Sequence, residues 1–468
     1  MPRGGRQLLN LHGARRNGGR DYDHSVDRKS HQAKVAAVAD GIASLADAPA
    51  PVHIEKGGVH HVVPVPSDPR FRSRPVDVSA LTEILHIDTE ARTCRAEAGM
   101  TFADLVRATL PLGLMPAVVP ELKEITIGGA VSGCSIESAS FRYGGFHDTC
   151  LEYEVVTGDG RVLTCSREQD PMIFEMMHGS YGTLGILTCL TFRLVPAKPY
   201  VRLEYRRLST AEELHAELLE RSRAEDVDFV DAIVHSPNEF VACLGTMCDS
   251  APYTSSYDRL GIYYRSTRLK DEDYLTTEDY FFRYDTDAHW LTATIPPLQW
   301  KAVRAVLGGF ILGSTNLIKW SMRLERILRL KKRPDVVVDV FIPARRFVDF
   351  FEWYERIFDF FPLWVVPYRM PQPYPWLDPS QAERIGGDLM LDCAVYGKKN
   401  NELQVDYSEL LEEKTHELGG VKTLISRNHY TRDRFWSIYN ATNYYAVKEK
   451  TDPGGLFPDL FDKFHRVG

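Results

Sequence analysis

Residues 120–147 read PELKEITIGGAVSGCSIESASFRYGGFH, and this stretch decides the fold that the sequence predicts. It contains five glycines, four serines and two alanines, and almost no bulky side chain interrupts it from Gly128 to Ser140. Because glycines adopt positive φ easily, such a stretch lets backbone N–H groups approach an anion closely. It has neither the Lys-Ser/Thr ending of a P-loop nor the G-x-G-x-x-G spacing of a Rossmann turn. It predicts another kind of anion-binding loop, and a Gly/Ser-rich surface loop is the alternative.

The composition excludes several classes of protein. The chain has 468 residues, 44% of them hydrophobic, which is enough for two or three domains. A net charge of −8 offers no basic field for nucleic acid. Eight cysteines without C-x-x-C spacing predict neither a metal site nor a disulfide framework, so a cytoplasmic setting is expected. No apolar run reaches the roughly 18 residues of a spanning helix.

The order of helix and strand patterns favours an α+β fold. Residues 1–29 are basic but lack the apolar core of a signal peptide, and we expect a disordered tail there. Ser30 is expected to cap the first helix, Thr101 the second, and Gly158-Asp159-Gly160 to form a hairpin turn. Strands and helices follow one another without strict βαβ alternation, which argues against a doubly wound sheet.

Residues 307–333 form the most membrane-like segment of the sequence. Apolar residues alternate there with seven basic ones, and Glu325 is the single acidic residue among them. A basic amphipathic helix of this kind can lie on an anionic bilayer. The alternative is an ordinary surface helix packed on the protein.

Taken together, these segments resemble the flavoproteins of the vanillyl-alcohol oxidase and p-cresol methylhydroxylase (PCMH) superfamily, and within it the Δ24-sterol reductase branch with its bacterial relatives. The resemblance covers about residues 50–468. The matching residues in the first half are Pro120-Glu121-Leu122, Thr126-Ile127-Gly128-Gly129, Gly133, Ile136-Glu137-Ser138, Tyr143-Gly144 and Gly182-Thr183-Leu184-Gly185. Those in the second half are Tyr280–Asp285, Trp290, Leu363–Pro367, Asp392, Ala394–Gly397, Phe435-Trp436 and Leu456–Pro458.

The resemblance implies a bilobal α+β protein that binds FAD. A PCMH-type FAD-binding domain of two α+β subdomains would span residues 30–197, and a substrate cap domain with an antiparallel sheet and flanking helices would span 198–415. Residues 416–468 would return to the FAD lobe. The implied cofactor-binding residues are Lys56, Gly57, Gly58, Val59, His60, Glu121, Thr126, Ile127, Gly128, Gly129, Gly133, Ser135, Ile136, Glu137, Ser138, Gly182, Thr183, Gly185 and Ile186.

The chain departs from the family pattern in two places. Some family members attach the flavin covalently through a histidine of the first loop, but here His60 is displaced within Lys56–His61, so we expect non-covalent FAD. The sterol reductases carry an N-terminal membrane anchor, and the sequence shows no such segment. If the substrate is a lipid, we expect membrane contact through 307–333 and a cytoplasmic protein that binds peripherally.

The reaction expected from the resemblance is reduction of a lipid C=C bond with NAD(P)H as electron donor. An isolated alkene has no carbonyl to accept charge, so a protein acid must supply a proton. His429 and Tyr430 are candidate donors, and Arg369 is a candidate for positioning an anionic group. Glu121 or Glu137 could contact the flavin edge or orient the donor. Each of these residues could instead have a purely structural role, as a capping residue or at a solvated turn or strand end.

Two other functions stay open from the sequence. One is an FAD-dependent oxidase or dehydrogenase of an alcohol or hydroxy acid, which the Lys422 and Asn428–Tyr430 region faintly suggests. The other is an interaction protein whose chemistry has been lost. The expected partner is a small lipid, without nucleic acid, and no oligomeric state is predicted.

Overall fold

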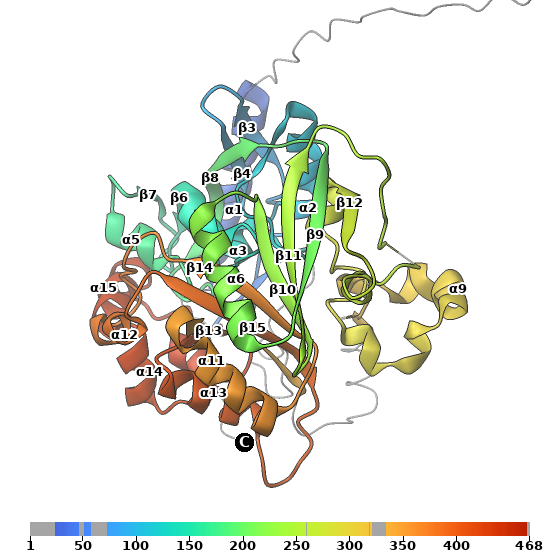
Figure 1. Cartoon of the computed structure of the whole chain (residues 1–468). Coiled ribbons are helices and arrows are strands. Elements are labelled where there is room, and N and C mark those ends of the chain that lie inside the picture. The colour runs from blue at the N-terminus through green and yellow to red at the C-terminus, as the bar shows by residue number, and fades with distance from the viewer. Residues whose placement is uncertain are drawn as a thin grey trace, which may run out of the picture.

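The computed structural model describes residues 24–45, 51–57, 73–258, 260–317, 319–320 and 334–465. It has two lobes, each built around an antiparallel sheet with helices, and a small parallel strand pair beside the first lobe (Figure 1). This confirms the bilobal α+β fold expected of a PCMH-type protein. Within the described ranges, no helix is both long and apolar enough to cross a bilayer.

The first subdomain joins one helix to two parallel strands. Its elements are α1 (His24–Ala43), β1 (His53–Glu55) and β2 (Pro75–Asp77). Val35 and Ile42 of α1 are buried against Val76 of β2. Because α1 begins at His24 rather than at Ser30, the predicted disordered tail extends too far. Residues 1–23 and the loop 58–72 lie outside the described residues.

A buried histidine fastens α1 to the sheet of the second subdomain. The Nδ1 atom of His31 lies 2.9 Å from Glu97 Oε1, and its Nε2 atom lies 3.0 Å from Glu154 Oε1. Burial disfavours the imidazolium, but the hydrogen bonds to Glu154 and Glu97 outweigh it and raise the pKa of His31 to about 9. The charged histidine therefore stabilises the docked helix at neutral pH.

We expect His31→Gln to destabilise the protein by about 1.5–3 kcal/mol at pH 6, the range for hydrogen bonds to charged groups. The folded pKa of His31 lies above its ordinary value of 6.5, so its contribution is complete below pH 6.5 and is lost as the pH rises through about 9. Urea unfolding of both proteins at pH 6 and pH 9.5 checks this. A difference that stays constant between these pH values would contradict it.

The second subdomain is a six-stranded antiparallel sheet of order β3-β4-β8-β6-β7, with β5 paired to the end of β8. Its strands are β3 (Ile84–Asp88), β4 (Thr93–Glu97), β5 (Leu114–Pro116), β6 (Cys150–Val156), β7 (Val162–Ser166) and β8 (Ile186–Pro196). Its helices are α2 (Phe102–Thr109), η2 (Leu110–Leu112), α3 (Ile127–Ser132), α4 (Ser140–Tyr143), η3 (Phe146–Thr149) and α5 (Pro171–Met176). Thr101 caps α2 and residues 158–160 connect β6 to β7, as predicted.

The second lobe, the cap, is an eight-stranded antiparallel sheet of order β12-β9-β11-β10-β14-β15-β13-β16. Its strands are β9 (Tyr200–Leu208), β10 (Phe229–Ser236), β11 (Glu239–Cys248), β12 (Glu272–Thr276), β13 (Val336–Pro343), β14 (Leu363–Arg369), β15 (Leu389–Lys398) and β16 (Val421–Lys422). Because side chains alternate along a strand, Val338 and Val340 of β13 enter the core beneath the covering helices, while Asp339 and Phe341 face the first lobe.

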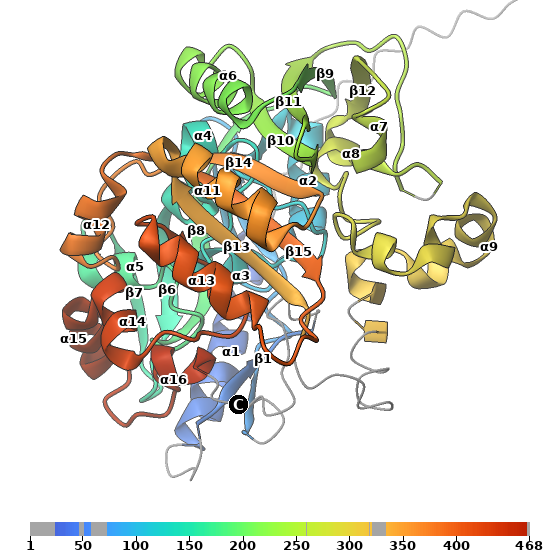
Figure 2. The ribbon, with the colours of Figure 1, turned by 60° about the horizontal axis from the view of Figure 1, so that its bottom comes forward.

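Helices cover the outer face of the cap sheet (Figure 1). They are α6 (Ala211–Ala224), η6 (Ala344–Arg346), α11 (Phe347–Trp353) with the π-helical turn η7 (Tyr354–Phe358), and α13 (Tyr407–Glu417). A separate group follows β11 on the side of the cap: α7 (Tyr263–Ser266), α8 (Thr277–Phe281), η4 (Leu291–Thr294), η5 (Pro296–Gln299) and α9 (Lys301–Ile311). Figure 2 shows α9 projecting from the body of the molecule.

The C-terminal segment contacts both lobes. Its β16 adds an edge strand to the cap sheet beside β13. The nearby helices are α12 (Pro379–Ile385), α14 (Arg432–Ile438), α15 (Ala441–Thr451) and α16 (Leu460–Phe464). Lys448 of α15 donates to the carbonyl of Thr183 at 2.8 Å, and Val52 donates to the carbonyl of Leu456 at 3.1 Å. These bonds hold the end of the chain against the first lobe.

Candidate active site

A cavity of about 1490 Å³ lies between the two lobes. The glycine stretch of the first lobe forms one wall, the inner face of the cap sheet forms the opposite wall, and the C-terminal segment closes a third side. The volume exceeds the roughly 300–1,000 Å³ of an ordinary small-ligand pocket. The cavity therefore has room for a large cofactor together with a substrate.

Glycines shape the first wall for two different reasons. A β-carbon at Gly128 would lie 2.8 Å from Ala98 Cβ and 2.9 Å from the Ala98 carbonyl oxygen, so a side chain there would push α3 away from the sheet. A β-carbon at Gly129 would lie 3.9 Å from the Nζ atom of Lys56. Gly128 thus allows close packing, whereas Gly129 keeps the space in front of a lysine ammonium open.

Lys56 brings a partly buried cation to this glycine wall. Burial lowers the pKa of its ammonium to about 8, although the charge of Glu124 opposes that change. A buried cation is costly unless an anion meets it. A lysine ammonium beside closely approachable backbone is the donor set that a pyrophosphate needs, so the residues present fit FAD.

Most of the predicted cofactor residues line the cavity. Those on its walls are Lys56, Glu121, Thr126, Gly128, Gly129, Gly133, Ser135, Ile136, Gly182, Gly185 and Ile186. The walls do not include Gly57, Ile127, Glu137, Ser138 or Thr183. Ile127 belongs to the hydrophobic core, and Thr183 donates its hydroxyl to the carbonyl of Ser180. Gly58, Val59 and His60 lie outside the described residues.

Glu137 and Ser138 instead join the first lobe to the cap. Arg283, fully buried, lies 3.2 Å from Glu137 Oε1 and 3.3 Å from Asp231 Oδ2 on β10. The Ser138 hydroxyl is 2.8 Å from the Tyr280 hydroxyl. The predicted cofactor contact of Glu137 is therefore replaced by an ion-pair triad behind the wall.

Three carboxyl groups face the cavity near the cap sheet. They are Glu121 from the first lobe, Asp339 from β13 and Asp392 from β15. Burial and then the charge of Glu137 raise the pKa of Glu121 to about 8. Burial raises the pKa of Asp339 to about 6, while hydrogen bonds from Tyr396 and Thr423 oppose the rise. Burial, followed by the charges of Asp339 and Glu121, raises the pKa of Asp392 well above its ordinary value.

An aromatic cage holds His289 beside these carboxyl groups. Its ring centroid lies 4.3 Å from that of Tyr396, 4.8 Å from that of Tyr284 and 4.9 Å from that of Trp364. Its Nε2 atom lies 3.7 Å from Glu121 Oε1. Burial, helped by the charge of Arg283, lowers the pKa of His289 well below its ordinary value. The ring is therefore neutral at physiological pH.

The remaining wall of the cavity on the cap side is apolar. It is formed by Leu291, Ile295, Leu298, Ile311, Leu317 and Trp320. These residues belong to η4, η5, α9 and the helical turns that follow. A substrate placed there meets hydrocarbon on one side and the carboxyl groups on the other.

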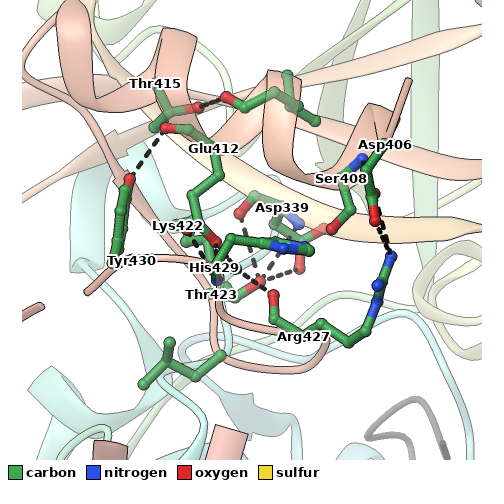
Figure 3. Close-up of polar contacts among 12 residues, drawn as sticks. Asp339, Asp406, Ser408, Glu412, Thr415, Lys422, Thr423, Arg427, His429 and Tyr430 are labelled. Atoms are coloured by element: carbon green, nitrogen blue, oxygen red, sulfur yellow. Dashed lines mark hydrogen bonds and ion pairs between the residues drawn. The ribbon is translucent and has the colours of Figure 1, made fainter. Parts of the chain in front are cut away.

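The structure places the three predicted catalytic residues away from the cavity walls. Arg369 donates to the Phe141 carbonyl at 3.1 Å and to Asp388 at 2.7 Å. The backbone N–H of His429 and the Tyr430 hydroxyl bind Glu412 of α13 (Figure 3). Burial, together with Lys422 and Arg427, lowers the pKa of His429 to about 4. The side chains of Arg369 and Tyr430 make structural contacts, whereas His429 does so through its backbone and its buried Nε2 atom has no hydrogen-bond partner among the described residues. Since none of the three lines the cavity, the geometry does not support their predicted roles.

The sequence contained a signal for two of the carboxyl groups that line the cavity. Asp339 interrupts the apolar strand 336–342, and Asp392 interrupts the apolar strand 389–395. A carboxylate inside a buried strand costs free energy unless it is paired or neutralised, so such a residue suggests a function. The sequence pattern alone does not show that the two strands are neighbours.

Known proteins resemble the chain over most of its length. The sequence profile of a family described as FAD binding domain matches residues 33–166. Delta(24)-sterol reductase of Homo sapiens is 26% identical over 398 residues, covering 82% of this chain and 76% of the relative. Delta(24)-sterol reductase of Arabidopsis thaliana is 26% identical over 434 residues, covering 84% and 77%. Cytokinin dehydrogenase 7 of Oryza sativa is 37% identical over 131 residues, 27% of this chain and 25% of the relative.

Proposed function

Because the chain is an FAD-linked oxidoreductase of the vanillyl-alcohol oxidase and PCMH superfamily, we propose that it reduces a carbon–carbon double bond of a lipid. The substrate would be a sterol or isoprenoid side chain, or a methylene-branched fatty acyl chain. The relatives named Delta(24)-sterol reductase support this class of substrate. The electron donor would be NAD(P)H.

One observation carries the proposal: the cavity joins an apolar wall to the buried carboxyl groups of Glu121 and Asp392, whose pKa values burial raises. An alkene without a neighbouring carbonyl cannot delocalise the charge that a hydride brings, so a proton must arrive at the second carbon. Exposed carboxylates are ionised at pH 7 and cannot supply it. Glu121 and Asp392 differ from them because burial and like charges keep them neutral.

The first lobe holds the cofactor, and the cap holds the substrate. Lys56 and the wall from Thr126 to Ile136 would bind FAD non-covalently. Reduced FAD supplies a hydride. The apolar wall of η4, η5 and α9 would orient the hydrocarbon chain and exclude water. Trp364 and Tyr396 of the cap sheet would confine the reacting carbons near the carboxyl groups.

Anaerobic absorbance spectroscopy of the purified holoprotein tests the function. We expect NADPH or NADH to bleach the flavin, and an alkene-bearing lipid added next to restore the oxidised spectrum. A saturated lipid of the same chain length is the control and should leave the flavin reduced. A flavin that neither nicotinamide bleaches would contradict the proposal, and peroxide formation with a polyol or hydroxy acid would favour the oxidase alternative.

A lipid substrate raises the question of how it reaches the cavity. Four large apolar side chains of the α9 region are exposed: Ile295 (47%), Trp300 (63%), Val306 (72%) and Trp320 (44%). Ile295 and Trp320 also line the cavity, so the apolar surface continues into it. We propose that this projecting region contacts the membrane surface. The predicted contact segment 307–333 overlaps it, but residues 318 and 321–333 lie outside the described residues.

We expect Trp300→Ser combined with Val306→Ser to weaken binding to vesicles of phosphatidylcholine and phosphatidylglycerol by about 10-fold or more, because each apolar side chain contributes about 1.5–3 kcal/mol when fully buried. Co-sedimentation with vesicles measures the effect. Leu403→Ser is the matched control, since Leu403 is 90% exposed and lies between β15 and α13. Equal loss of binding in the control would show that general surface hydrophobicity is responsible.

A further inference from the structure

Asp339 and Asp392 lie on neighbouring strands and on the same face of the cap sheet. In the register of β13 and β15, Asp339 is opposite Ala394 and Asp392 is opposite Phe341. Residues opposite one another share a face, and so do residues two apart on one strand. The two carboxyl groups are therefore diagonal neighbours facing the cavity.

Asp339 and Asp392 differ in the hydrogen bonds that their carboxyl groups accept. Asp339 Oδ1 accepts a hydrogen bond of 2.5 Å from the Tyr396 hydroxyl, and its Oδ2 accepts a longer one of 3.4 Å from Thr423. Asp392 is 1% exposed, and its Oδ1 atom has no hydrogen-bond partner among the described residues. His289 nearby also has a buried Nε2 atom without a hydrogen-bond partner there. Two unpartnered polar side chains at one cavity wall indicate a place for a ligand.

The charges around Asp392 explain why the pKa values of Asp339 and Asp392 differ. The side chains that act on it are Asp339 from β13 and Glu121 from the first lobe, both acidic. Asp339 accepts hydrogen bonds as a carboxylate does, and a carboxylate on the neighbouring strand makes a second one costly in a buried site. Burial and the charge of Asp339 thus favour the protonated form of Asp392, whereas the hydrogen bonds from Tyr396 and Thr423 favour the carboxylate form of Asp339.

We propose that Asp392 is the proton donor of the reaction and that the Tyr396–Asp339 pair positions it. This assignment rests on the proposed function. The Asp392 O–H bond breaks and a C–H bond forms at one alkene carbon, leaving the carboxylate of Asp392. The other carbon receives the hydride and with it two electrons. One proton and one hydride together convert the C=C bond to CH–CH, and the carboxylate regains its proton from solvent.

Asp392 suits this role better than Glu121 because of where each lies. Glu121 belongs to the first lobe, immediately before the glycine wall that would hold the cofactor. Asp392 lies on the opposite wall, in the cap sheet. A hydride arriving from the first lobe and a proton arriving from the cap reach different faces and different carbons of a substrate between them.

Stopped-flow spectroscopy of the Asp392→Asn holoprotein tests the assignment, because asparagine keeps the shape but cannot donate the proton. We expect NADPH to bleach the flavin at the wild-type rate, and reoxidation by the lipid alkene to slow by about 10²–10⁴-fold. Asp392→Glu should recover part of that rate. Asp388→Asn, an exposed aspartate just before β15, is the matched control and should behave as wild type.

A second readout does not depend on turnover. Burial also raises the pKa of Asp148 to about 7, so Asp148 contributes a protonated carboxyl band in every variant. Infrared spectra of protein labelled with ¹³C-aspartate at pH 7 should therefore show the same protonated carboxyl band in the wild type and in Asp388→Asn, and a band weaker by one carboxyl group in Asp392→Asn. Tyr396→Phe removes a hydrogen bond that lowers the pKa of Asp339, so it should move the acid limb of the rate profile to higher pH. If Tyr396 had a merely structural role, Tyr396→Phe would lower the rate equally at every pH and would not shift the acid limb.

The outcomes separate the two proposals. If the wild-type flavin is never reoxidised by an alkene lipid, the proposed function fails. If it is reoxidised and Asp392→Asn reacts at the wild-type rate, or shows a protonated carboxyl band of wild-type intensity, the assignment of Asp392 is wrong while the function stands.

Discussion

Replacing Arg283 with methionine should destabilise the protein by about 3–5 kcal/mol, the usual cost of removing one member of a buried ion pair. The Arg283 side chain is fully buried and lies against Glu137 and Asp231. Without it, two carboxylates remain in a site from which water is excluded. Asp231 keeps hydrogen bonds of 2.8 Å from the Tyr284 hydroxyl and the Trp364 indole, but no cation would balance its charge.

Chemical denaturation followed by fluorescence measures this loss. Adding Glu137→Gln to Arg283→Met should restore part of the stability, because it removes one of the stranded charges. Arg107→Met is the control, since the Arg107–Glu278 pair is 56% and 41% exposed and should contribute at most about 1 kcal/mol. If Arg283→Met costs no more than the control, the triad is not what joins the two lobes.

Replacing Lys56 with methionine should weaken FAD binding by about 10- to 150-fold, which corresponds to the 1.5–3 kcal/mol of a hydrogen bond to a charged group. The same change removes a cation whose burial lowers its pKa to about 8. The protein without FAD should therefore be as stable as the wild type, or more stable, near neutral pH. Loss of affinity without loss of stability distinguishes a cofactor contact from a structural one.

Fluorescence titration of the FAD-free protein with FAD measures this affinity. In the wild type we expect affinity to fall as the pH rises above about 8, because the ammonium then loses its proton. The fall should be absent in Lys56→Met. Lys399→Met, at an exposed position after β15, is the control and should bind FAD normally. Unchanged affinity in Lys56→Met would remove Lys56 from the FAD site.

Local sequence patterns predicted most of the elements. The cap at Thr101 located α2, and Gly158-Asp159-Gly160 located the turn between β6 and β7. These features depend on hydrogen bonds between residues close in sequence, so they can be read without the fold. The start of α1 was misplaced: the structure begins the helix at His24, so Ser30 lies inside it rather than at its cap.

The predicted catalytic residues failed for a related reason. Arg369 ends a cap strand, but its guanidinium bonds to the Phe141 and Ser222 carbonyls rather than to a ligand. His429 and Tyr430 follow β16 and bind α13. The type of residue suggested a function in each case, and only the packing of other elements showed what the side chain contacts.

The sequence by itself determined the wall that fits the cofactor, because a run of glycines and small residues lets a ligand approach the backbone closely wherever the run lies. The tertiary structure alone decided which acid keeps its proton. In the sequence Asp339 and Asp392 are alike, each an acid inside an apolar strand. In the fold, hydrogen bonds from Tyr396 and Thr423 lower the pKa of Asp339, whereas burial and the charges of Asp339 and Glu121 raise the pKa of Asp392. Since the fold assembles that environment from separate segments, no single stretch of sequence contains it.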